Sequence, residues 1–135
     1  MKKKSLVTLC IIIIIVAIFV VFSNKNLNEG QLANTFEVSA VYLSDEHIVK
    51  ISYYDKTNKT DAVTLEVIGL SPSFQKIYHA SNFVEDVPIT NPPQYGWSTL
   101  PVTFLVEHEQ LGEIQLKTEI TPTGEPQAKI IYSKP

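Results

Sequence analysis

Arginine is absent from this chain of 135 residues, and cysteine and tryptophan each occur once. Residues 23–135 carry 8 lysines against 14 acidic residues, a net charge of −6. Such a body lacks the bidentate guanidinium group that grips phosphates, and its negative field repels a nucleic-acid backbone. We therefore expect no nucleic-acid partner.

The one cysteine, Cys10, lies inside an apolar run near the N-terminus. The rest of the chain therefore cannot form an intramolecular disulfide, even in an oxidising compartment, which excludes a disulfide-stapled scaffold. It also lacks the paired cysteines of a structural zinc site.

The apolar run covers residues 6–22, where 16 of 17 residues are hydrophobic, and it follows Lys2, Lys3 and Lys4. As a helix it spans roughly 25 Å, near the short limit for crossing a bilayer. The lysines before it favour a cytoplasmic N-terminus. We predict a cytoplasmic basic leader (1–5), a transmembrane signal-anchor helix in contact with membrane lipid (6–22), and an extracytoplasmic body. The expected location is the cell membrane, with a single pass.

Two alternatives to an anchor follow from the same segment. Val21-Phe22-Ser23 offers a weak cleavage site, so the body is secreted if the chain is cut near Ser23. The layout also resembles that of type IV pilin-like proteins, which join a basic leader and an apolar helix to a β-rich head. That resemblance implies a surface filament subunit. Ser5 departs from its pattern, since a small Gly or Ala is usual before the cleavage site.

After a polar tether (23–34), the domain expected over 35–135 alternates between apolar and polar residues, which is typical of half-buried strands. Breaks at Gly69, Gly112 and the prolines separate the strands at sandwich-like intervals. The pattern predicts a seven-stranded antiparallel immunoglobulin-like β-sandwich, with a small β-barrel as the alternative. The expected strands are 36–42, 48–54, 62–68, 74–83, 102–108, 114–120 and 128–132.

Two groups of side chains resemble metal ligands in type but not in spacing. His47, His79 and His108 are far apart in the sequence, and alternation sends Glu107 and Glu109 to the face opposite His108. We expect these histidines at the surface or at strand edges. The other group, Asp55, Asn58 and Asp61, lacks the spacing and the glycine of an EF-hand, and it predicts a plain hairpin turn. No metal or cofactor is expected.

The segment 91–97 is the strongest candidate for a contact surface. Pro92 and Pro93 stiffen the chain, and Tyr95 and Trp97 supply large amphipathic rings that suit a partner-binding loop. The alternative is that Trp97 folds over the open end of the core. We expect Trp97 to cover the core and Tyr95 to be the more exposed ring.

No nucleophile elbow, phosphate-binding loop or metalloprotease motif occurs in the sequence, so we predict that the protein is not an enzyme. The expected function is a membrane-anchored, non-enzymatic interaction or accessory module of the cell envelope, contacting another envelope protein. The alternatives are an exported domain that binds a small ligand or a metal, and a pilin-like filament subunit.

Overall fold

The computed structural model describes residues 2–23 and 28–135, and most of residues 36–135 are strands arranged in two sheets. Sheet A has the order β5–β2–β1–β8, and its strands are β5 (Asn82–Pro88), β2 (Ile48–Asp55), β1 (Phe36–Leu43) and β8 (Thr121–Pro122). Sheet B has the order β4–β3–β6–β7–β9, and its strands are β4 (Phe74–Tyr78), β3 (Thr60–Val67), β6 (Val102–His108), β7 (Gly112–Thr118) and β9 (Ile131–Ser133). The sequence pattern therefore predicted the β class and the division into two packed sheets.

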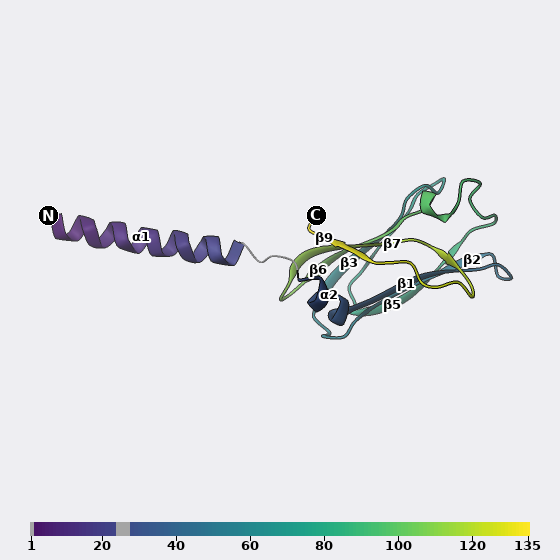
Figure 1. Ribbon diagram of the computed structural model, residues 1–135, viewed down its shortest axis with the longest axis horizontal. Coiled ribbons are helices and arrows are strands. Elements are labelled where there is room, and N and C mark those ends of the chain that lie inside the picture. The colour runs from purple at the N-terminus through teal and green to yellow at the C-terminus, as the bar shows by residue number, and fades with distance from the viewer. Residues whose placement is uncertain (1, 24–27) are drawn as a thin grey trace.

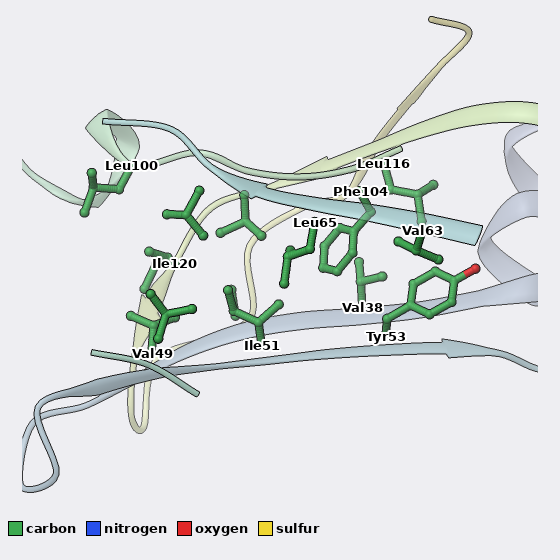
Figure 2. Packing of buried hydrophobic residues seen from close by; sticks show 14 of the residues in the cluster. Val38, Val49, Ile51, Tyr53, Val63, Leu65, Leu100, Phe104, Leu116 and Ile120 are labelled. Carbon is green, nitrogen blue, oxygen red and sulfur yellow. The ribbon is translucent and has the colours of Figure 1, made fainter. Parts of the chain in front are cut away.

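Alternation along the strands builds the core between the sheets, because every second side chain points inward. Val38 of β1 and Tyr53 of β2 face Leu65 of β3 and Phe104 of β6, and all four side chains are almost fully buried (Figure 2). Burying a large apolar side chain contributes about 1.5 to 3 kcal/mol. The two inner faces thus hold the sheets together.

The segment 74–83, predicted as one strand, is divided between two. The chain leaves sheet B after Tyr78 and enters sheet A at Asn82, so residues 79–81 cross from one sheet to the other. The carbonyl of Ser81 accepts a hydrogen bond from the amide of Asp55 and so starts the new pairing. Pro88 is the last residue of β5 at the edge of sheet A, where a missing donor is tolerated.

The C-terminal segment also differs from the prediction. Residues 121–124 look like a turn in the sequence, but Thr121 and Pro122 pair in parallel with Val41 and Tyr42. The amide and the hydroxyl of Thr123 both donate to the carbonyl of Tyr42. The last strand is Ile131–Ser133 rather than 128–132. A parallel contact between segments about 80 residues apart leaves no trace in local alternation.

A short helix, α2 (Glu29–Thr35), occupies part of the segment interpreted as an irregular tether. Asn28 caps it, because its side chain accepts a hydrogen bond from the amide of Gln31 at 3.2 Å. Leu32 is buried and joins the core, which holds the helix against the start of β1. Figure 1 places α2 and the turn η1 (Trp97–Thr99, green) at opposite ends of the body.

The apolar run near the N-terminus forms the helix α1 (Lys2–Ser23). Its described side chains from Val7 to Phe19, including that of Cys10, are exposed. The hydroxyl of Thr8 donates to the carbonyl of Lys4 at 2.9 Å. Among the residues that the structure describes, no helix is both long and apolar enough to cross a membrane.

Candidate functional site

The loop between β5 and β6 contains the predicted contact residues and is ordered by its own hydrogen bonds. The amide of Gly96 donates to the carbonyl of Pro93 at 3.2 Å, and the hydroxyl of Thr99 donates to the carbonyl of Gly96 at 2.7 Å. Gly96 has a φ of 93°, a region that side chains rarely adopt, so glycine permits the reversal there. Pro92 is exposed and Pro93 is half-buried.

Trp97 anchors this loop on the body. Its ring centroid lies 4.7 Å from that of Tyr42, which is buried at the end of β1, and the ring planes meet at 44°. Trp97 is only partly buried but packs against the core cluster, and nearby Leu100 is buried. The prediction that Trp97 covers the end of the core is therefore confirmed.

A close backbone approach fixes the loop from the other side. Gly69, which follows β3, has a φ of 98°, and a Cβ atom placed there would lie 2.6 Å from the carbonyl oxygen of Thr99. Such a contact is shorter than real Cβ atoms show, so only glycine lets the two segments meet. Two contacts thus hold the loop: Trp97 packs on Tyr42, and the backbone at Thr99 lies against the turn at Gly69.

Tyr95 stands out from this anchored loop. Its side chain is 82% exposed, the highest value among the large hydrophobic residues for which exposure is described. The prediction that Tyr95 is the more exposed of the two rings is confirmed. A rigid aromatic side chain presented in this way loses little conformational entropy when a partner covers it.

The three histidines lie apart. His47 is exposed in the turn between β1 and β2, and His79 is exposed, with its Nδ1 3.3 Å from the carbonyl oxygen of Asp61. His108 is buried, so the expectation of a surface position was wrong for this residue. Within the described residues, no three His, Cys, Asp or Glu side chains are grouped in a way that could hold a metal ion.

His108 is buried because it ends the inward-facing row of β6 and meets Asp55, which ends the inward-facing row of β2. The Nε2 atom of His108 is 3.3 Å from Oδ2 of Asp55, and their side chains are 1% and 0% exposed. Asp55 also accepts hydrogen bonds from the amides and hydroxyls of the following turn. These donors are the amide and hydroxyl of Thr57 (2.8 and 2.6 Å), the amide of Lys59 (3.0 Å) and the hydroxyl of Thr60 (2.8 Å).

The hydrogen bonds around His108 fix its tautomer. Nδ1 accepts from the amides of Gln110 and Leu111, both at 3.2 Å, so the ring proton lies on Nε2 and points toward Asp55 and the hydroxyl of Thr57. Burial raises the pKa of Asp55, but the hydrogen bonds from the turn outweigh it and hold this pKa below its ordinary value. Hydroxyl, imidazole and carboxylate are in contact here; the side chains of His108 and Asp55 are buried, whereas Thr57 is exposed. The arrangement ties the β2–β3 turn to the β6–β7 turn.

The prediction of a plain hairpin turn was wrong, because β2 lies in sheet A and β3 in sheet B, so the connection crosses between the sheets, and Asp55 at its start is buried. Asn58 in this connection and Asp61 at the start of β3 are exposed, and the three side chains do not converge on one point. The signal for Asp55 was present in the sequence, because it continues the alternating row of Val49, Ile51 and Tyr53.

A cleft of about 460 Å³ lies between the first half of β1 and the C-terminal segment. Two pairs of polar groups in its lining bind each other: the hydroxyls of Ser39 and Ser52 are 2.5 Å apart, and the side-chain amide of Gln127 donates to the carbonyl of Val38. Comparisons with protein-family models, curated proteins and solved structures find no match to this chain.

Proposed function

We propose that this protein is a membrane-anchored, extracytoplasmic, non-enzymatic module of the cell envelope that contacts another envelope protein through the loop around Tyr95. The observation that carries the proposal is the combination of an 82% exposed tyrosine with an anchored loop. Exposed aromatic rings held in place are the side chains that most often supply binding energy in protein interfaces.

The anchor is supported by α1 and by the sequence around it. The described side chains from Val7 to Phe19 are apolar except for Thr8, and they surround the helix on all sides. The hydroxyl of Thr8 is satisfied within the helix, as a polar group in lipid must be. The apolar run of the sequence, 6–22, extends beyond these side chains at both ends. Lys2, Lys3 and Lys4 favour a cytoplasmic N-terminus.

The order of the strands supports an immunoglobulin-like sandwich. In that architecture the first, second and fifth strands share one sheet, and the third, sixth and seventh share the other. Here β1, β2 and β5 lie in sheet A, and β3, β6 and β7 lie in sheet B, whereas the fourth strand, β4, pairs with β3 in sheet B instead of joining sheet A. Sandwiches of this kind present loops at their two ends, and the Tyr95 loop lies at one of them (Figure 1).

Site-specific crosslinking in the native membrane tests the proposal. A photoreactive amino acid at position 95 should capture a defined envelope protein, and the same amino acid at exposed Ile77 of β4 is the control. Capture at both positions, or at neither, would contradict the role of the loop. Protease added outside the membrane should digest the body and spare the N-terminus. A mature protein that begins at Leu6 would instead favour the filament alternative.

A further inference from the structure

The outer edge of β5 offers unpaired backbone groups to another strand. The amide of Asp55 bonds to the carbonyl of Ser81, and bonded pairs alternate along an antiparallel ladder. Residues 83, 85 and 87 therefore bond to β2, and the N–H and C=O groups of Asn82, Val84 and Asp86 point away from it. In the described part of the chain, β5 is the terminal strand of sheet A, so no further strand covers these groups.

We infer that two copies of this protein associate through β5, in an antiparallel pair centred on Val84, so that their sheets A join across a twofold axis. At this register Val84 lies opposite Val84 of the second copy, and Asn82 lies opposite Asp86. Each of these pairs can exchange two backbone hydrogen bonds. The inference concerns a different surface from the Tyr95 loop and does not depend on the membrane anchor.

The side chains favour this register over its neighbours. A register centred on Glu85 would oppose Glu85 to its own copy, and one centred on Asp86 would oppose two aspartates, which is destabilising. A register centred on Phe83 would overlap little more than Asn82 to Val84. The register centred on Val84 gives the longest overlap that opposes no like charges.

The exposure of Val84 and the ion pairs of the neighbouring carboxylates agree with a second copy of the chain pairing with β5. Val84 is 62% exposed on the outer face of sheet A, so its pairing with itself would remove apolar surface from water. Asp86 already has a partner, Lys50, at 3.3 Å, and the inward-facing Glu85 is bound by Tyr78 and Lys76. Each carboxylate next to the twofold axis thus has a lysine beside it before the two copies meet. The lysine partly balances its charge, which lowers the cost of bringing the two copies together.

Because a single strand supplies a small interface, we expect a weak dimer that disulfide trapping detects better than size measurement. The test uses the full chain in detergent micelles with Cys10→Ser as the background. Val84→Cys should give an oxidised dimer, since paired residues lie about 5.5 Å apart at Cα, within the range for a disulfide. Ile77→Cys is the matched control, because Ile77 is 59% exposed on the other edge strand, β4.

The register is tested by a pair of charge variants in the Val84→Cys background. Asn82→Asp faces Asp86 of the second copy and should lower trapping about fivefold, whereas Asn82→Lys should preserve or raise it. Thermal unfolding of each variant establishes that the fold is intact. Equal trapping at positions 77 and 84, or equal effects of the two charge variants, would overturn the inference. Because micelles need no native envelope, these outcomes are independent of whether Tyr95 captures a partner.

Discussion

Asp55 and His108, 53 residues apart in the sequence, meet at the ends of β2 and β6 with Oδ2 and Nε2 separated by 3.3 Å. Each side chain ends the inward-facing row of its strand, so the last position of the core in both sheets is polar. The ring of His108 also packs edge-on against Phe36, with centroids 5.6 Å apart. This contact joins the start of β1 to the two turns.

Removing the carboxylate of Asp55 should destabilise the fold. Asp55→Asn places an N–H₂ group among the hydrogen-bond donors that now point to the carboxylate, and we expect a loss of about 3 kcal/mol in the free energy of unfolding. Urea unfolding followed by circular dichroism measures it. The control is Asp61→Asn at an exposed position at the start of β3, which should change stability by less than about 0.5 kcal/mol. Equal effects of the two variants would contradict the role of the buried network.

The same network predicts how stability depends on pH. The folded-state pKa of Asp55 is depressed, since hydrogen bonds from Thr57, Thr60 and Lys59 outweigh the opposing effect of burial. Its contribution is therefore fully present above the unfolded pKa of about 3.9 and is lost as pH falls through the folded value.

We expect the stability difference between the wild type and Asp55→Asn to be constant above about pH 5 and to shrink below about pH 4. Unfolding curves recorded at each pH for both proteins measure this difference, in which the other carboxyl groups cancel. A stability difference that grows on acidification would show that folding raises the pKa of Asp55 instead of lowering it.

The close approach at Gly69 predicts an unequal response of two glycines with similar backbone angles. Gly69 has a φ of 98° and Gly124 a φ of 88°, but only the Cβ atom added at Gly69 meets another segment, at 2.6 Å from the carbonyl oxygen of Thr99. Both Gly→Ala variants carry the strain of a positive φ, about 1 kcal/mol. Gly69→Ala should lose at least about 1 kcal/mol more. Thermal unfolding of the two variants measures these losses of stability. Equal losses would show that the turn at Gly69 can move away from the β5–β6 loop without cost.

The sequence predicts the features that arise from local alternation and fails for those that arise from distant contacts. The inward row of β6 was visible from Val102 to His108, and the exposed Tyr95 followed from the composition of its loop. The same row indicated an inward position for His108, but this histidine was expected at the surface, because its partner, Asp55, comes from another strand. The helix α2 was missed because its two buried residues, Leu32 and Thr35, are too few to give a periodic signal. The pairing of β8 with β1 was missed for a similar reason, since only the folded chain brings the two together.

The two aromatic residues of the β5–β6 loop should separate stability from binding. Trp97→Ala removes the ring that packs on Tyr42 at the end of the core, and we expect a loss of about 2 kcal/mol, less than for a fully buried aromatic because Trp97 is only partly covered. Tyr95→Ala removes an exposed ring and should change stability by less than about 0.5 kcal/mol. Circular dichroism is the readout for both variants, because Trp97 is the only tryptophan and its fluorescence disappears with the substitution.

Capture of an envelope partner should fall at least tenfold for Tyr95→Ala, since the loss of a central contact residue costs about 2 kcal/mol or more. The matched control is Tyr95→Phe, which keeps the ring and loses only the hydroxyl. Retention of capture by Tyr95→Phe and its loss in Tyr95→Ala would identify the ring surface as the contact. Unchanged capture by Tyr95→Ala in a stable protein would remove the loop from the proposed function and leave the fold as described.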